Sequence, residues 1–484
     1  MQKVYVNKAL KMEKIKWIGF DMDATLAVYN LQNFESFVFE LVREKLILMG
    51  HSEELAKYTY DASFSVRGAW FDKRHGNLLK SDEHNNILAA WHGLRKMQSS
   101  EIRAMYPNKH MPFDGERVFV LNTIFNQPET FMLACMIDMY ERSSLYTATE
   151  DGRGFISGSN VLTFREISDD LRRVVDIVLR SDQYKSHMVN NLERFILRDK
   201  RAVPFLTSLR QANKKLFLLT NSDFNFTNSL MSFIYGTNWR TLFDIVVVDG
   251  EKPKWFATDA FFREVDVQTG KTKMGHHEGP FSTGAVYSGG SVVEFRRNTR
   301  LTGKDTLYVG DHIYGDVMRS KKTGGWRTFL IVPELDREIS IWKSQRKRYL
   351  EMRRIDHQLH EEEMTASSES FHDEDSENST SPPKNNKRNV TFYKDEAAKL
   401  ELEYSKMGSL LRSGLRETWF AGQMRRYADL YAGCVYDLHH YPVSGSFYVA
   451  PQFFWPTRSW RQRIENLADQ LQRPQDTIFS KQAL

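Results

Sequence analysis

The stretch that most constrains this chain is an apolar run that ends in two aspartates one residue apart. Residues 15–20 are mostly apolar, as expected for a buried strand, and Asp21 and Asp23 follow directly, with Thr25 behind them. In an open α/β sheet, ligands bind where parallel strands end at their carboxyl edge. Because residues i and i+2 of an extended chain can point the same way, both carboxylates could act on one phosphate group.

This pair of carboxylates suits phosphoryl transfer through a covalent intermediate. Asp21 would attack phosphorus and become an aspartyl-phosphate, while Asp23 would protonate the leaving oxygen and then deprotonate the attacking water. Two carboxylates this close repel each other, so a cation is expected between them. Asp-x-Asp is common, however, and a strand that runs into an acidic turn also explains it.

A second apolar strand, residues 215–219, ends in groups that can bind phosphate. Thr220 and Ser222 offer hydroxyls, and Asn221 offers an amide. A hydroxyl after a strand is, on its own, more often a helix N-cap than a ligand contact. The assignment therefore depends on the groups at the ends of the remaining strands.

Two further apolar strands end in charged groups. Residues 243–248 precede a loop that contains Lys252, which could neutralise phosphoryl charge, although a lone loop lysine is usually solvated. Residues 306–309 precede a glycine-containing turn with Asp311 and Asp316. Four strand ends in the order acid pair, hydroxyl, lysine and acid pair favour a phosphoryl-transfer site far more than any one of them does.

Length and charge limit the broad class of protein. The 484 residues suffice for about three domains. The net charge of +5 is small for this length, and no basic face or aromatic-rich groove motif is visible, so no nucleic-acid partner is expected. The N-terminus is charged, and no apolar stretch reaches spanning length. We therefore expect no membrane contact and a cytoplasmic location.

The chain predicts an α/β fold with a parallel core sheet and a large insertion. Residues 1–31 and 201–340 carry the core, and residues 32–200 form an inserted cap domain that would shield the site. Residues 341–390 are highly charged and poor in apolar side chains, which predicts a disordered loop. Helical spacing resumes afterwards, so residues 391–484 are predicted to be a helical extension that packs on the core or on a subunit interface.

The four strand-end motifs resemble those of haloacid-dehalogenase (HAD) phosphatases. Beyond the motifs, from about Gly19 to Tyr441, the chain resembles the cytosolic purine 5′-nucleotidase family. The stretches that carry this second resemblance are Gly76–Lys80, Tyr106–Lys109, Leu121–Asn126, Tyr287–Ser291, Gly324–Phe329 and Arg426–Tyr431.

The resemblance implies a HAD-like Rossmannoid core with an inserted cap, an Mg2+ ion and a homotetramer. It implies hydrolysis of purine nucleoside 5′-monophosphates such as IMP and GMP, with phosphotransfer to a nucleoside as a side activity. The implied catalytic residues are Asp21, Asp23, Thr220 and Lys252. The implied metal ligands are Asp21, the main-chain carbonyl of Asp23, and Asp311, with Asp316 in support.

The resemblance also implies a base-binding and phosphate-side set, which comprises Phe125, Asn126, Arg172, Asp176, Lys185, Asn221 and Ser222. An aromatic face can stack on a purine, although core packing would explain Phe125 taken alone. Leu179 and Arg180 stand where the family has a histidine and a tyrosine, which leaves the purine preference open.

A nucleotide effector site is implied at Asn122, Tyr314, Lys322, Gln423, Arg426 and Tyr427. The arginine expected upstream of this set falls near Pro112 instead, so activation by an ATP-type effector stays open. Two alternatives remain. One is a phosphatase of altered substrate preference. The other is a catalytically quiet oligomeric scaffold that binds partners through the charged residues 346–388.

Overall fold

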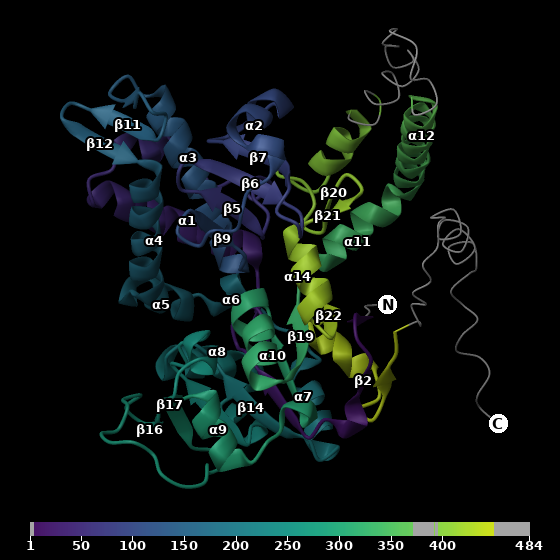
Figure 1. Cartoon of the computed structure of the whole chain (residues 1–484). Helices are drawn as coiled ribbons and strands as arrows, with labels where there is room; N and C mark the ends of the chain where they lie inside the picture. Colours follow the sequence, from purple (N-terminus) through teal and green to yellow (C-terminus); the bar gives the residue numbers. More distant parts are fainter. Residues whose placement is uncertain (1–3, 371–391, 393–394, 450–484) are drawn as a thin grey trace. The chain divides into compact units, whose positions relative to one another are not determined.

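A mostly parallel sheet forms the core of the computed structural model, which describes residues 4–370, 392 and 395–449 (Figure 1). Within these residues the sheet has nine strands in the order β1-β22-β19-β18-β3-β14-β15-β17-β16. The interior pairs are parallel, and the two edge strands, β1 and β16, are antiparallel to their neighbours. The strands span, in that order, Tyr5–Val6, Leu430–Ala432, Arg327–Ile331, Thr306–Gly310, Trp17–Phe20, Lys215–Leu219, Ile245–Val248, Val286–Gly289 and Phe262–Val265. The predicted α/β fold class is confirmed.

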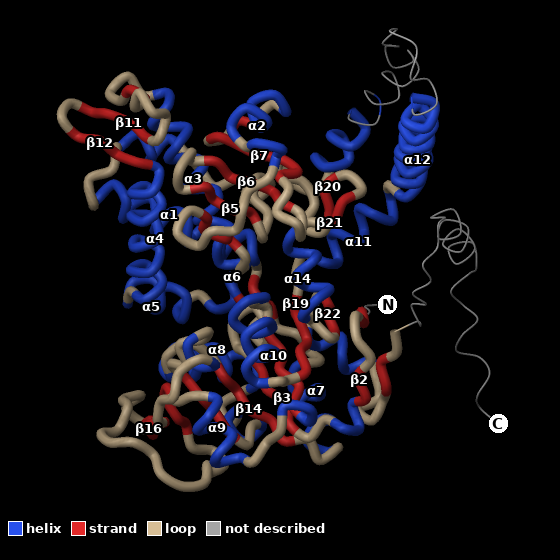
Figure 2. Tube along the Cα trace, viewed as in Figure 1, coloured by secondary structure: helices blue, strands red, loops and turns tan. Residues whose placement is uncertain are grey.

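The central strands are continuous apolar runs, as expected for parallel strands covered on both faces. All residues of β3 and β15 are buried, as are the last four of β14. Strand β3 pairs with β14 on one side, as Figure 2 shows, and with β18 on the other. Phe20 therefore lies opposite both Leu218 and Val309, which brings the carboxyl ends of three strands to one edge.

Four helices of the described residues lead into or connect the core strands, and three of them, α7, α8 and α9, bury apolar side chains. On α7, for example, Phe205, Leu206 and Leu209 are all buried. The four helices are α7 (Ala202–Gln211), α8 (Phe224–Tyr235), α9 (Val292–Thr299) and α10 (Arg319–Gly324).

The segment between β3 and α7 folds into helices and a second sheet. Its helices are α1 (Leu31–Leu48), α2 (Ser99–Met105), α3 (Gln127–Arg142), α4 (Phe164–Arg180), α5 (Asp182–Asn190) and α6 (Leu192–Phe195). Its antiparallel sheet has the order β8-β7-β6-β5-β9, with strands at Arg95–Lys96, Ile87–His92, Asn77–Ser81, Ala69–Asp72 and Val118–Leu121. A smaller sheet contains β10 (Thr147–Ala148), β11 (Gly154–Ser157) and β12 (Asn160–Thr163).

The chain enters and leaves this inserted segment through two paired short strands. β4 (Val28–Tyr29) precedes α1, and β13 (Ile196–Leu197) follows α6. The two strands are antiparallel, with Tyr29 opposite Ile196. Met1–Phe447 groups as one compact unit, so the cap boundaries at residues 32 and 200 stay a prediction.

The prediction of a disordered loop at residues 341–390 is wrong for the first part of this range, where the chain is helical. Helix α11 (Leu335–Ser344) runs into this region, and α12 (Arg346–Ser370) follows. Tyr349 and Met352 of α12 pack against Leu400, so these few apolar residues suffice to hold the helix start. Residues 371–391 lie outside the described residues.

The C-terminal extension, residues 391–484, was predicted to be helical, and its described part is only partly so. It contains α14 (Trp419–Tyr427), but also β22, a strand of the core sheet, and the short hairpin β20–β21 (Arg412–Ser413 and Arg416–Glu417). It also contains β23 (Ser446–Phe447), which pairs with β2 (Leu10–Lys11) from the start of the chain. Asp429, buried just before β22, accepts hydrogen bonds from Lys321 and from Thr328. A three-residue strand held by such contacts carries no alternation pattern. Residues 450–484 lie outside the described part of the chain.

Among the residues with a described structure, no helix combines the length and the apolar character that crossing a membrane requires.

Candidate active site

Three aspartates from the carboxyl edge of the core sheet form a buried cluster. Asp21 follows β3, Asp311 follows β18, and Asp316 lies in the π-helical turn Ile313–Met318. One carboxylate oxygen from each lies within 4.8 Å of the others. Gly310 makes this approach possible, because a Cβ there would come within 2.4 Å of Asp316 Oδ2.

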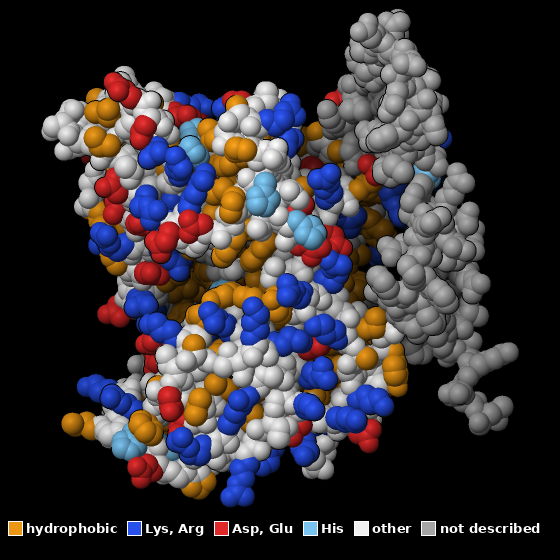
Figure 3. Space-filling model, in the orientation of Figure 1, with side chains coloured by type: hydrophobic (Ala, Val, Ile, Leu, Met, Phe, Trp, Pro, Cys, Tyr) orange, Lys and Arg blue, Asp and Glu red, His pale blue; other side chains and the backbone are white. Residues whose placement is uncertain are grey.

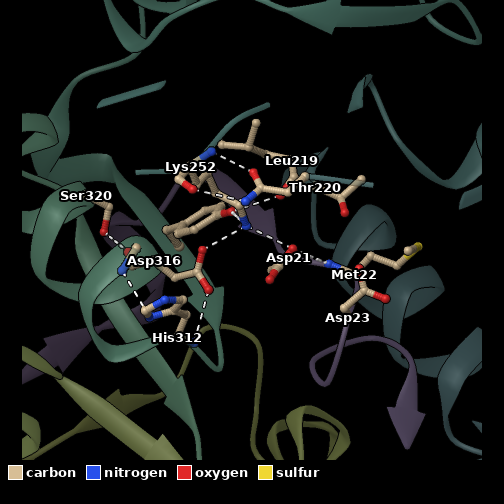
Figure 4. A network of polar contacts seen from close by, with 12 residues as sticks. Asp21, Met22, Asp23, Leu219, Thr220, Lys252, His312, Asp316 and Ser320 are labelled. Atoms are coloured by element: carbon tan, nitrogen blue, oxygen red, sulfur yellow. Dashed lines mark hydrogen bonds and ion pairs between the residues drawn. The ribbon is translucent and has the colours of Figure 1, made fainter. Parts of the chain in front are cut away.

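Lys252 lies within this cluster (Figure 4). Its Nζ is 2.8 Å from Asp21 Oδ1 and 2.8 Å from Asp316 Oδ1, and it donates to the Tyr308 hydroxyl at 3.1 Å. Asn221 holds the lysine's backbone, accepting from Lys252 N at 2.6 Å and donating to its carbonyl at 3.0 Å. The predicted lysine therefore meets Asp21 of the first acid pair and Asp316 of the second.

The electrostatics of the cluster leave a deficit of positive charge. Burial raises the pKa of Asp21 to about 8, although Lys252 opposes this rise. Burial also raises the pKa of Asp311 well above its usual range, and Asp311 Oδ2 is buried without a hydrogen-bond partner. Burial would lower the pKa of Lys252, but Asp21 and Asp316 hold it well above its ordinary value. Three carboxylates and one ammonium group thus fit a bound divalent cation, for which carboxylate oxygens are suitable ligands.

Asp23 is held apart from this cluster by two hydroxyls. Its Oδ1 accepts from the Tyr29 hydroxyl at 2.7 Å, and its Oδ2 accepts from the Ser222 hydroxyl at 2.8 Å. Burial raises the pKa of Asp23, and these two hydrogen bonds oppose the rise. A raised pKa favours the protonated carboxyl group, which is the form that a general acid needs.

A cavity of about 680 Å³ opens over the carboxylate cluster. Figure 3 shows the visible face hollowed near α5 and α8, which supply Tyr184, Lys185 and Phe226 to the cavity wall. The predicted site residues that line it are Asp21, Asp23, Phe125, Asn126, Arg172, Asp176, Lys185, Asn221, Ser222, Lys252, Asp311 and Asp316. Thr220 does not line it; its side chain is buried, and its Oγ1 accepts from Ser222 N.

The polar groups of the predicted base-binding and phosphate-side set contact other side chains of the protein. Asn126 donates to Glu129 Oε2 at 2.5 Å and accepts from Thr123 N. Arg172 also contacts Glu129 Oε2, at 3.2 Å, and Lys185 contacts Asp223 at 2.6 Å.

The Phe125 ring lies edge-on to its aromatic neighbours. Its centroid is 5.9 Å from that of Tyr29 and 5.4 Å from that of Phe34. Both neighbouring side chains are buried, and Phe125 packs against the core while it also lines the cavity. Core packing and contact with a ligand are therefore compatible at this position.

The predicted effector residues lie elsewhere, and none of the six lines this cavity. Lys322 Nζ lies 5.2 Å from the centroid of the Tyr427 ring, and the Arg426 guanidinium lies 5.4 Å from it. Tyr314 is covered by Arg319 at 4.9 Å. Asn122 precedes the turn that carries Phe125, and Gln423 lies on α14. The structure thus brings Lys322, Arg426 and Tyr427 together.

Sequence reasoning missed four residues that organise the site. Tyr29 binds Asp23, Tyr308 binds Lys252, Glu129 joins Asn126 to Arg172, and Arg67 donates to the main-chain oxygen of Asp311. Tyr308 lies in a strand next to the acid pair, so strand register would have indicated it. The other three come from the inserted segment or its connection, and no motif marks them.

A parallel α/β core whose strand ends gather a lysine and several carboxylates defines a hydrolase of the phosphatase class. Comparison with protein families agrees. The model of the 5′ nucleotidase family matches residues 4–455, and the chain belongs to that family. The predicted resemblance to 5′-nucleotidases is confirmed, and the protein is a phosphoric monoester hydrolase.

Individual relatives agree with this assignment. The chain is 28% identical over 464 residues to the 5′-nucleotidase domain-containing protein 2 of Rattus norvegicus, covering 92% of this chain and 78% of that protein. It is 27% identical over 464 residues to the Homo sapiens protein of the same name, covering 92% and 83%.

Solved structures resemble the chain more distantly. A HAD phosphatase from Thermococcus onnurineus matches with a TM-score of 0.26 and 12% identity, covering 66% of this chain and 87% of that one. CbbY from Rhodobacter sphaeroides in complex with phosphate matches with a TM-score of 0.25 and 12% identity, covering 66% and 86%. The family assignment rests on the sequence match alone.

Proposed function

We propose that this protein is an Mg2+-dependent 5′-nucleotidase that hydrolyses purine nucleoside 5′-monophosphates, such as IMP and GMP, to nucleoside and phosphate. The observation that carries the proposal is the position of Lys252, whose Nζ contacts both Asp21 and Asp316 at 2.8 Å on the wall of a cavity of about 680 Å³. A buried cation between two carboxylates is suited to neutralise a transferring phosphoryl group.

The residues proposed to hold the metal ion are the carboxylates of Asp21, Asp311 and Asp316 and the main-chain carbonyl of Asp23. The unpaired Oδ2 of Asp311 and the mutual approach of the three carboxylates support this set. When bound, the ion supplies positive charge that offsets the carboxylates and the phosphoryl oxygens.

The proposed reaction has two steps that use Asp21 and Asp23. A carboxylate oxygen of Asp21 attacks phosphorus, the bond from phosphorus to the nucleoside oxygen breaks, and Asp23 donates its proton to that leaving oxygen. Asp23 then accepts a proton from water, the water oxygen attacks phosphorus, and the bond to Asp21 breaks. Attack by a nucleoside hydroxyl in place of water would give the proposed phosphotransfer.

The proposed roles of the other residues follow from their positions. Lys252, Asn221 and Ser222 line the cavity beside Asp21 and can donate to phosphoryl oxygens. Thr220 keeps its proposed phosphate role only if its hydroxyl, which accepts from Ser222 N, turns toward the cavity. The Phe125 ring, which also lines the cavity, would stack on a purine. The polar groups proposed to bind the base are Asn126, Arg172 and Asp176, and Lys185 is proposed to lie on the phosphate side.

A second candidate keeps the chemistry but changes the ester. Arg180 lines the cavity, and among the described residues it has no anionic partner, whereas Arg172, Lys185 and Lys252 each contact a carboxylate. A phosphate ester with a second anionic group would find a cation there. The scaffold alternative receives no support from the family assignment.

The expected location, oligomeric state and effector belong to the same proposal. A cytoplasmic homotetramer with a nucleotide effector remains the proposed setting. The grouping of Lys322, Arg426 and Tyr427 supports the effector, because two cations around an aromatic ring suit an anionic nucleotide.

The test is phosphate release from IMP, GMP, AMP and a sugar bisphosphate, each with Mg2+ and with chelator. Asp21→Asn removes the nucleophile and should abolish release, whereas Asp259→Asn, a matched change at an exposed aspartate, should not. Preference for the bisphosphate would favour the second candidate. Failure of the wild-type protein to release phosphate from any nucleotide would refute the first.

A further inference from the structure

Arg67 is a buried cation that joins the inserted segment to the loop after β18. Its side chain is 0% exposed. Its Nε and Nη2 donate to the two carboxylate oxygens of Glu334, both at 2.7 Å. Its Nη1 donates to the main-chain oxygen of Asp311 at 3.3 Å, and its guanidinium lies 4.9 Å from the centroid of the Phe420 ring.

These contacts fix the guanidinium in one orientation. A forked pair of hydrogen bonds to a carboxylate sets both the position and the plane of an arginine head group. With the plane of the guanidinium fixed, its third nitrogen, Nη1, points toward the main-chain carbonyl of Asp311. The adjacent Gly68 shows how closely the segment is packed, since a Cβ there would come within 2.8 Å of Phe420 Cβ.

The partners of Arg67 come from three separate parts of the chain. Asp311 follows core strand β18, Glu334 follows core strand β19, and Phe420 belongs to α14, while Arg67 itself shortly precedes β5 of the inserted segment. A movement of the inserted segment relative to the core would therefore displace a donor from the backbone of Asp311.

Within the carboxylate cluster, Asp311 is the aspartate whose side chain does not contact Lys252. Its Oδ2 has no hydrogen-bond partner, whereas Asp21 and Asp316 both contact Lys252. Arg67 supplies the backbone contact and a nearby positive charge. Outer groups that orient a metal ligand typically change metal affinity by about 10–100-fold when they are removed.

We propose that Arg67, oriented by Glu334, is a positioning residue through which the inserted segment sets the geometry of Asp311 and hence the affinity of the carboxylate cluster for a divalent cation. This inference rests on the metal site of the proposed function. It does not depend on which phosphate ester is the substrate.

A purely structural cross-link would explain the contacts as well, so the test must separate metal affinity from stability. Lys80 offers a matched control, because its Nζ contacts Glu401 at 2.9 Å and its side chain is 4% exposed. It too joins the inserted segment, through β6, to the C-terminal part of the chain, but its hydrogen bonds go to Glu401 and the main chain of Met407, outside the carboxylate cluster.

The experiment measures the Mg2+ dissociation constant by calorimetry on the full-length protein without substrate, together with thermal unfolding. The variants are Arg67→Gln, Arg67→Lys, Glu334→Gln and Lys80→Gln. Arg67→Gln should weaken Mg2+ binding about tenfold. Arg67→Lys, which keeps the charge but loses the fork, should fall between it and the wild type, as should Glu334→Gln. Lys80→Gln should lower the unfolding temperature and leave the dissociation constant unchanged.

Unchanged Mg2+ affinity in folded Arg67 variants would overturn the inference, as would an equal loss in Lys80→Gln or a wild-type protein that binds no Mg2+. Should Arg67→Gln fail to fold, Arg67→Lys and Glu334→Gln decide the question. Metal binding that responds to Arg67 in a protein without nucleotidase activity would refute only the proposed function. Nucleotidase activity with unresponsive metal binding would refute only this inference.

Discussion

Lys252 Nζ lies 2.8 Å from Oδ1 of Asp21, and both side chains are almost fully buried. Neither group would be stable there alone, because an isolated charge in the interior is expensive to desolvate. The pair places a permanent positive charge beside the atom proposed to attack phosphorus. Stability and chemistry are therefore linked at this contact.

Lys252→Met should impair both properties. We expect kcat to fall by about 10²–10³, because a preorganised charge at the phosphoryl group is lost. The folded state should lose about 3–5 kcal/mol, because Asp21 and Asp316 are left as unpaired buried acids. Steady-state kinetics and denaturant unfolding measure the two effects. A variant with normal kcat would contradict the proposed role.

Tyr29→Phe should shift the pH profile of kcat/KM. The Tyr29 hydroxyl donates to Asp23 and lowers its pKa, so removing it raises the pKa of Asp23 further. The general acid then keeps its proton to higher pH, and the alkaline fall in kcat/KM should move to higher pH.

Two matched variants check the origin of that shift. Ser222→Ala removes the other donor to Asp23 and should move the profile in the same direction. Tyr60→Phe removes a hydroxyl that donates to Glu35 instead, and should leave the profile in place. A profile that moves downward in Tyr29→Phe would refute the assignment of Asp23 as the acid.

Glu35→Gln should change the pH dependence of stability. Burial raises the pKa of Glu35 to about 8 in the folded protein, against 4.5 as its ordinary value. Between these values the folded state holds a proton that the unfolded chain has released, so the wild type loses stability as pH rises from about 4.5 to 8. Each pKa unit corresponds to about 1.4 kcal/mol.

Glutamine cannot ionise, so the variant should lack this loss and should gain on the wild type as pH rises. The free energy of unfolding of both proteins, measured by chemical denaturation at about pH 5 and about pH 8.5, gives the difference, because most of the range between the two pKa values lies between these pH values. Equal effects of the substitution at both pH values would show that Glu35 titrates normally in the folded protein.

Removing the metal should destabilise the wild type. Mg2+ that binds only the folded state at about 100 times its dissociation constant should add about 2.7 kcal/mol, and chelator should reverse the gain. Asp311→Asn should reduce this response, because one buried ligand and its charge are lost. Thermal unfolding with and without Mg2+ makes the comparison. A full response in Asp311→Asn would exclude that residue from the metal site.

The sequence predicts the core and the carboxylate–lysine cluster because both depend on local patterns. Apolar runs mark β3, β14, β15 and β18, and the polar residues behind them obey the general rule for parallel sheets. The loop position of Lys252 and the acids after β18 needed no knowledge of distant contacts. Thr220 is the exception, since its burial away from the cavity depends on a single side-chain rotation.

The remainder depends on contacts between distant segments. β22 spans three residues and joins the sheet only because its neighbours hold it there. The start of α12 lies in a charged stretch, and two apolar residues that meet Leu400 stabilise it. The contact of Arg67 with Asp311 joins a loop of the inserted segment to the core. No periodic pattern in the sequence indicates any of these three features.

The paired strands β4 and β13 have a mechanical consequence for catalysis. Since both covalent connections of the inserted segment run side by side through this ribbon, a swinging motion of that segment would have a single axis. Tyr29 lies on the axis itself while its hydroxyl binds Asp23, so opening for product exit need not disturb the proton donor. Arg67 lies outside this ribbon, so the same opening would lengthen its hydrogen bond to the main-chain oxygen of Asp311.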